Sequence, residues 1–235
     1  MSARPRPAAE ALQKVPFFSR LSSDEASALA QRLVQRHFEE NQVIFHRGDP
    51  GGLLYIISEG KVKITHSTPE GQEALLAILG TGDFFGELAL LDDAPRSATA
   101  VAMERTHALT LHRDEFLDFL GQNPDFADHV MRTLAERIRH LNDQISDVFF
   151  LDLNGRLART LLNLAENHGR QVDEGILIDL ALTQTDLAEM TGATRVSINK
   201  ALGRFRRAKW VRLDGRTLIL LDVSALSNLI ELAGG

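Results

Sequence analysis

Hydrophobic and polar positions divide the chain into segments with different periods. Residues 10–36 have the spacing of helices, and within them Ser22 and Glu25 fit a capping box. Over residues 37–112 the spacing changes to short alternating runs separated by glycines, for example "LLYIISEGKVKITHS" and "EALLAILGTGDFF". Short strands with regularly spaced turns predict an antiparallel barrel or sandwich.

A long helix is predicted from about Pro124 onward. Its apolar residues are spaced alternately four and three apart, which is the heptad pattern of a coiled-coil seam. We expect two copies of the chain to pack through this seam as a two-fold dimer; packing on the chain's own barrel is the alternative. The residues assigned to the dimer interface are Met131, Leu134, Ile138, Leu141, Ile145 and Val148.

The sequence after this helix predicts a second domain. Asn154–Gly155 is a turn signal and marks the expected boundary. Beyond it we expect a helix over 156–167, a short strand over 176–180 and two short helices. "WVRLDGRTLILLD" has the pattern of a hairpin, with Asp214–Gly215 as its type I′ turn.

The stretch "LTQTDLAEMTGATRVSINKALGRF" has the spacing of a helix–turn–helix. Thr183 and Asp186 fit a capping box for the first helix, and Ala188 is small where two helices approach closely. Gly192 permits a left-handed turn, and Thr194 can cap the second helix. The second helix of such a motif enters the DNA major groove with its N-terminal residues.

The outward positions of this second helix are the candidates for reading DNA. Arg195 and Lys200 can bond guanine O6 and N7, and Val196 can contact a thymine methyl group. The alternative is a solvated basic helix in an unrelated domain. The full set predicted to contact bases or phosphates is Gln184, Thr185, Thr194, Arg195, Val196, Ser197, Asn199, Lys200 and Arg216.

Charge is distributed unevenly along the chain. The net charge is −6, which argues against a protein that simply coats nucleic acid. Residues 195–216, however, contain eight basic side chains opposed only by Asp214. The C-terminal third therefore carries a local positive surface within an otherwise acidic chain.

Composition excludes several classes of protein. The chain has no cysteine, which excludes disulfides, zinc–thiolate sites, thiol catalysis and iron–sulfur clusters held by cysteine. No apolar run approaches the roughly 20 residues needed to span a bilayer, and residues 1–14 do not have the pattern of a secretory signal. We expect a cytoplasmic protein without a membrane partner. No recognisable catalytic or metal-binding constellation is present, so we do not expect an enzyme.

The order of these segments resembles the cAMP receptor protein/FNR (Crp/Fnr) family of bacterial transcription regulators. The resemblance covers about residues 15–230 and is carried by "FGELALLDDAPRSA", the heptad helix, "LDLNGRLARTLL" and the helix–turn–helix. It implies an α+β fold with an N-terminal cyclic-nucleotide-binding-like β-roll (an antiparallel jelly-roll), a long dimerisation helix and a C-terminal winged helix–turn–helix. The expected bounds are 1–14 for a flexible tail, 15–123 for the effector domain, 124–150 for the dimerisation helix and hinge, and 151–235 for the DNA-binding domain.

In this family "FGELALLDDAPRSA" corresponds to the cassette that binds the phosphate of a cyclic nucleotide. By resemblance, Gly86 lets the backbone approach the phosphate, and Glu87 accepts from the ribose. Leu88 lies in the short helix whose first amides face the anion. Arg96 supplies charge and a fork of donors, and Ser97 adds a hydroxyl. The alternative is that Arg96 serves an internal salt bridge, for instance with Glu87.

The chain departs from the cAMP-binding pattern at two places. The adjacent threonine and serine that bond adenine correspond to Leu141 and Asn142, of which only Asn142 can hydrogen-bond a base edge. On the recognition helix, the arginine–glutamate–arginine pattern reads Arg195, Val196 and Lys200, so the preferred operator should differ at the base pair that glutamate would read.

The resemblance therefore predicts a DNA-binding transcription regulator that forms a homodimer on a double-stranded operator, with a cyclic nucleotide as its candidate effector and RNA polymerase as a candidate partner. Three alternatives stay open. The chain could be a nucleotide-sensing subunit that acts on a protein partner, a family member without a cyclic-nucleotide ligand, or a haem-based sensor. The histidines are scattered without metal-binding spacing.

Overall fold

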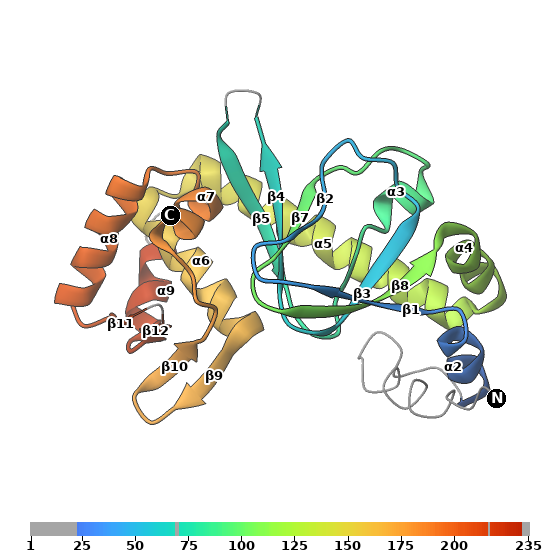
Figure 1. Ribbon diagram of the computed structural model, residues 1–235. Coiled ribbons are helices and arrows are strands. Elements are labelled where there is room, and N and C mark those ends of the chain that lie inside the picture. The colour runs from blue at the N-terminus through green and yellow to red at the C-terminus, as the bar shows by residue number, and fades with distance from the viewer. Residues whose placement is uncertain (1–22, 69–70, 216, 232–235) are drawn as a thin grey trace. The chain divides into compact units, whose positions relative to one another are not determined.

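The computed structural model describes residues 23–68, 71–215 and 217–231, which fall into two compact units divided between Glu136 and Arg137 (Figure 1). The predicted tail over 1–14, the cap at Ser22 and the side chain of Arg216 lie outside the described residues. Each unit is described separately below. No helix in the described ranges combines the length and the apolarity that crossing a bilayer requires.

The described part of the N-terminal unit contains two four-stranded antiparallel sheets, with strand orders β1-β8-β3-β6 and β2-β7-β4-β5. This arrangement confirms the predicted antiparallel β-roll. The strands are β1 Val34–Phe38, β2 Val43–Phe45, β3 Leu53–Glu59, β4 Val62–Ser67, β5 Glu73–Leu79, β6 Phe84–Phe85, β7 Thr99–Ala102 and β8 Thr106–His112.

Strand β3 contributes to two hydrophobic clusters of this unit because both of its faces are apolar. Tyr55 and Ile57 point into a cluster that includes residues of both sheets, whereas Leu54 and Ile56 point to the opposite face. Helices cover that opposite face and bury Phe116, Phe119 and Phe126 against it. The covering helices are α2 Ser23–Ala30, α3 Leu88–Leu91, α4 Arg113–Gln122 and the start of α5 Pro124–Phe150.

Two sequence expectations for this unit are wrong. The helical pattern predicted over 10–36 ends at Ala30, and Val34 already belongs to β1, because antiparallel pairing with β8 determines its conformation. Helix α4 was not predicted. It begins at Arg113, directly after β8, without the glycine or proline that usually separates elements, and its start is capped by His112 and Glu115.

The C-terminal unit is a helical domain with a four-stranded antiparallel sheet of order β11-β12-β10-β9. The predicted hairpin, helix–turn–helix and flanking helix are present. After α5, the elements are α6 Leu153–His168, β9 Gly169–Val172, β10 Gly175–Ile178, α7 Gln184–Thr191, α8 Arg195–Arg207, β11 Val211–Asp214, β12 Thr217–Leu220 and α9 Val223–Glu231.

The predicted turn at Asn154–Gly155 is wrong, because both residues lie in the first turn of α6. The helix begins one turn earlier than expected because the Asp152 side chain caps it by accepting a hydrogen bond of 2.8 Å from the Gly155 amide. Strand β9, which follows α6 directly, was not among the predicted elements. In the wing, Asp214 pairs with Thr217 and so belongs to β11, which corrects its predicted place in the turn.

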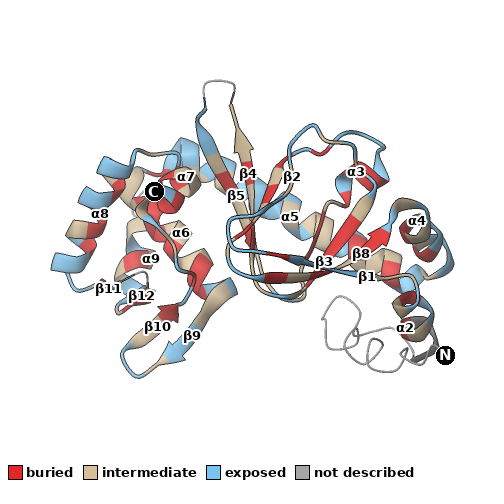
Figure 2. Ribbon diagram, viewed as in Figure 1, coloured by how far each residue is buried: buried red, intermediate tan, exposed pale blue. Residues whose placement is uncertain are grey.

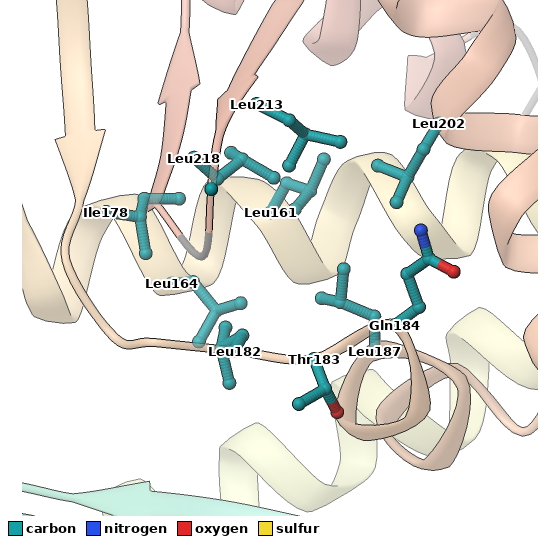
Figure 3. Close-up of a pocket in the computed structure, with 11 residues that line it drawn as sticks. Leu161, Leu164, Ile178, Leu182, Thr183, Gln184, Leu187, Leu202, Leu213 and Leu218 are labelled. Carbon is teal, nitrogen blue, oxygen red and sulfur yellow. The ribbon is translucent and has the colours of Figure 1, made fainter.

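The C-terminal unit encloses a cavity of about 230 Å³ between α6, the start of α7 and the wing (Figure 3). Its lining is mainly leucine, and includes Leu161, Leu164 and Leu218. The two polar side chains at its edge have partners: the Thr183 hydroxyl bonds Asp186, and the Gln184 amide bonds Asn199.

Candidate DNA-recognition and effector sites

The helix–turn–helix is built by local capping that the sequence predicts. The Thr183 hydroxyl accepts a hydrogen bond from the Asp186 amide at 3.1 Å, and the Asp186 carboxylate accepts one from the Thr183 amide at 2.8 Å. Gly192 adopts φ 63°, a left-handed conformation that favours glycine. The chain therefore reverses here, and α8 begins after Thr194, whose hydroxyl accepts from the Ser197 amide at 3.2 Å.

Replacing Thr183 by alanine should lower the free energy of unfolding of the C-terminal unit by about 0.5–2 kcal/mol, because the cap of α7 is lost. Denaturant titration of the purified protein measures this. Thr185→Ala is the matched control, since Thr185 lies inside the first turn of the same helix and is exposed. Equal destabilisation by the two substitutions would contradict a specific capping role.

Helix α8 divides cleanly into an inner and an outer face. Ile198, Ala201, Leu202 and Phe205 are at most 2% exposed and join the core of the unit, as predicted. Val196 is 65% exposed, although it is apolar. The predicted DNA-contacting residues on the outer side of α8 that are exposed are Arg195, Val196, Asn199 and Lys200; Ser197 is half-buried beside its cap.

Two basic residues of the positive segment are occupied within the protein. The Arg204 guanidinium donates to Asn154 Oδ1 at 2.6 Å and so ties α8 to α6. Arg212 on the wing forms an ion pair with Glu174. Both interactions join segments that are distant in the sequence, so charge counting alone does not reveal them.

In the N-terminal unit, the predicted effector residue Arg96 is only 5% exposed. Its Nη1 donates to the Gly86 carbonyl at 2.6 Å and its Nη2 to the Leu53 carbonyl at 2.8 Å. The guanidinium carbon lies 4.3 Å from the centre of the Phe45 ring, at cation–π distance. Nε of Arg96 is buried without a hydrogen-bond partner.

Gly86 is required here by its conformation and by the closeness of Arg96. Its φ is +83°, and a Cβ at this position would lie 2.5 Å from Arg96 Nη1. Burial lowers the pKa of Arg96, while the electrostatic influence of Tyr55, Glu87 and Asp49 acts in the opposite direction. Glu87 is itself buried, and its electrostatic effect on the pKa of Arg96 indicates that the two side chains lie near one another.

The other predicted effector residues differ in exposure. Leu88 begins the four-residue helix α3 and is exposed, and Ser97 is exposed beside the buried arginine. Asn142 is exposed on α5 in the C-terminal unit, and its contact with a ligand base remains a prediction. The cassette that the structure assembles therefore consists of Gly86, Glu87 and Arg96.

Helix α5 exposes most of the apolar residues of its heptad seam, which is called the stripe below (Figure 2). Leu134 is the exception: it packs against the helix-covered core of its own β-roll together with Phe126 and Val130, because residues four apart share a helix face. Its assignment to the dimer interface stays a prediction. The exposed members, each 46–62% accessible, are Met131, Ile138, Leu141, Ile145 and Val148.

Comparison with known proteins identifies both units. Residues 35–123 match the family described as "Cyclic nucleotide-binding domain", and residues 155–229 match "Crp-like helix-turn-helix domain". The chain is 35% identical over 219 residues to the "CRP-like cAMP-activated global transcriptional regulator" of Mycobacterium tuberculosis, covering 93% of this chain and 98% of the relative. The chain belongs to the Crp/Fnr family.

Further relatives of this Crp/Fnr regulator support the family assignment. It is 30% identical over 214 residues to the "Cyclic AMP receptor protein" of Thermus thermophilus, covering 91% of this chain and 96% of the relative. Among solved structures, a transcriptional regulator of the CRP family from the same organism superposes with a TM-score of 0.70 at 27% identity, covering 83% of this chain and 96% of that one. The protein is therefore a DNA-binding transcription regulator and not an enzyme.

Sequence reasoning missed two partners of the cassette in this Crp/Fnr regulator. Phe45 and the Leu53 carbonyl contact Arg96 from strands β2 and β3, more than 40 residues earlier in the chain. A backbone carbonyl has no sequence signature, and Phe45 reads as one more apolar residue of a short strand. Only the closure of the β-roll brings these groups to the arginine.

Proposed function

We propose that this Crp/Fnr regulator binds two-fold operators as a homodimer and is controlled by a small anionic effector, of which a cyclic nucleotide is the leading candidate. The effector would lie in the cassette of the β-roll, at Gly86, Glu87 and Arg96. The stripe of α5 would join two protomers, and Arg195, Val196 and Lys200 of each α8 would read bases in successive major grooves about 34 Å apart.

The observation that carries the effector assignment is the unsatisfied Nε of Arg96. A buried donor without a partner costs about 1–3 kcal/mol, and a phosphate oxygen would remove that cost. The other two nitrogens are already held by carbonyls of β3 and of the turn before α3. The guanidinium is thus held in position, with the Nε–H donor left for a ligand.

Control of DNA binding requires the effector to favour one of two arrangements of the protomers, which is a population shift. The connection between α5 and α6 consists only of Leu151 and Asp152. Arg156 donates to the carbonyls of Leu151 and Thr191, at 3.0 and 3.1 Å, and so joins this hinge to the turn of the helix–turn–helix. We infer that a rotation at the hinge would carry α8 with it.

Thermal shift against cAMP, cGMP and cyclic dinucleotides tests the effector assignment, followed by operator selection with any ligand that stabilises the protein. We expect one of these ligands to raise the melting temperature and to tighten operator binding in fluorescence anisotropy. Equal operator affinity with and without each ligand would contradict control by a cyclic nucleotide while leaving DNA binding intact.

Val196→Glu should change operator preference at one base pair in each half-site. A glutamate carboxylate accepts from the cytosine amino group, whereas valine can only contact the thymine methyl. We expect the variant to prefer cytosine there by about 1–3 kcal/mol. Selection from randomised DNA measures the change, and an unaltered preference would show that this exposed side chain does not face a base.

A further inference from the structure

Three basic residues at the C-terminal end of α8 have no assigned role. Arg206, Arg207 and Lys209 are exposed, and their side chains make no ion pair or hydrogen bond with any other described residue. This separates them from Arg204 and Arg212, which are engaged by Asn154 and Glu174. Of the basic residues from 195 to 212 in the described chain, the unengaged ones are Arg195, Lys200, Arg206, Arg207 and Lys209.

The two arginines lie on the same side of α8 as the residues proposed to read bases. In an α-helix, residues separated by four, seven or eleven positions return to nearly the same face. Arg207 therefore follows Val196 and Lys200 along one line, and Arg206 follows Arg195 and Asn199 along the adjacent line. The buried residues of α8 occupy the opposite side.

The length of α8 places its end beyond the groove. Its 13 residues extend about 20 Å, whereas the major groove is about 12 Å wide. When the N-terminal turns lie at base edges, the last turn reaches the phosphates that border the groove. Gly203, between Lys200 and Arg207, presents no side chain that would hold the helix away from DNA.

Lys209 provides a separate observation. It lies just after the helix and adopts φ 61°, a left-handed conformation. Glycine adopts this conformation at little energetic cost, whereas lysine is destabilised by it. A cation near a helix C-terminus is stabilised by the helix dipole. Arg206 and Arg207 already place positive charge in the last turn of α8, so the dipole does not require a lysine at 209 as well. Lysine at this strained position therefore indicates a use for its charge outside the domain.

We propose that Arg206, Arg207 and Lys209 form a phosphate-binding patch, called here the distal patch, that extends the DNA interface past the base-reading half of α8. This inference rests on the proposed docking of α8 in the major groove. The ligand is the sugar–phosphate backbone of double-stranded DNA. The patch supplies affinity and register without sequence preference, because phosphates carry no base information.

The test uses full-length Arg206→Gln/Arg207→Gln protein in anisotropy titrations at several salt concentrations. Each phosphate contact contributes about −0.9 to the slope of log K against log salt, so the double variant should lose about 1.8 of slope magnitude. Affinity should fall roughly thirty-fold near 0.15 M salt, by the same factor on operator and on unrelated DNA. Arg212→Gln, whose arginine is held by Glu174, is the matched control and should change the slope little.

Lys209→Gly separates charge from stability. It should raise the midpoint of thermal unfolding, because glycine relieves the left-handed strain, and yet reduce the salt slope by about 0.9. If the slope of log K against log salt is unchanged in both the double variant and Lys209→Gly, the distal patch does not bind DNA and the proposal is wrong. That is also the result expected if these residues bind an acidic protein surface instead. Failure of the base-reading proposal is distinguishable, since Arg195→Ala would then leave the ratio of operator to unrelated DNA affinity unchanged.

Discussion

Arg96→Leu abolishes the effect of the cyclic nucleotide on operator binding. Removing a charge that neutralises a desolvated phosphate costs about 2–5 kcal/mol of ligand binding, or roughly 30-fold to several thousand-fold in affinity. The loss includes the Nε donor of Arg96, which is buried without a partner among the described residues. Calorimetric titration with the stabilising ligand measures the affinity, and anisotropy with operator DNA measures the lost response.

The structure shows that Arg96 also supports the fold, so the variant needs a control. Leucine leaves the carbonyls of Gly86 and Leu53 without their donor and should lower the melting temperature. Arg113→Leu is a control for stability: Arg113 Nε donates to the Leu90 carbonyl of α3 at 3.0 Å, so it supports the same segment, but Arg113 is not among the residues proposed to bind the ligand. We expect Arg113→Leu to destabilise the β-roll while retaining the ligand response. Equal loss of response in both variants would show that Arg96 acts through stability alone.

Ile138→Glu/Ile145→Glu dissociates the homodimer. The isoleucines are 59% and 57% exposed on a single chain, and a partner helix would bury them for about 1.5–3 kcal/mol each. Two carboxylates facing their symmetry mates would remove that gain and add the cost of unpaired buried charge. A monomer binds only one half-site, so operator affinity should fall by a factor of about 10²–10⁴.

Sedimentation or light scattering establishes the oligomeric state, and anisotropy gives the operator affinity. Ser146→Glu adds a carboxylate to an exposed position of the same helix away from the stripe, and should leave the dimer intact. If the double variant remains a dimer with unchanged operator affinity, the stripe of α5 is not the interface.

The heptad stripe illustrates the limit of periodicity. A spacing of four and three residues specifies that one face of α5 is apolar, but it does not specify what covers that face. Leu134 satisfies the heptad and yet lies against the core built by Phe126 and Val130, because α5 turns a second apolar face toward its own β-roll at its N-terminal end. The sequence therefore predicted the helix and its apolar face, and the tertiary structure shows that Leu134 on this face also contacts the core of its own unit.

The cassette illustrates the same limit for chemistry. Gly86 and Arg96 stand ten residues apart within one motif, so their roles could be expected from the sequence. The contacts of Arg96 with Phe45 and with the Leu53 carbonyl depend on β2, β3 and the loop that carries Arg96 meeting at one place. Which of its nitrogens remains for a ligand follows only from those contacts.

What the sequence alone determined is local: the caps at Thr183 and Thr194, the reversal at Gly192, the alternation of the β-roll strands and the inward face of α8. These depend on residues within a few positions of one another, so a linear pattern contains them. What only the tertiary structure decided is the set of long-range partners. Of the basic residues counted along the C-terminal segment, Arg204 and Arg212 are held by Asn154 and Glu174, and Arg206, Arg207 and Lys209 are left for a ligand, because folding brings a partner to some charges in the described chain and none to others.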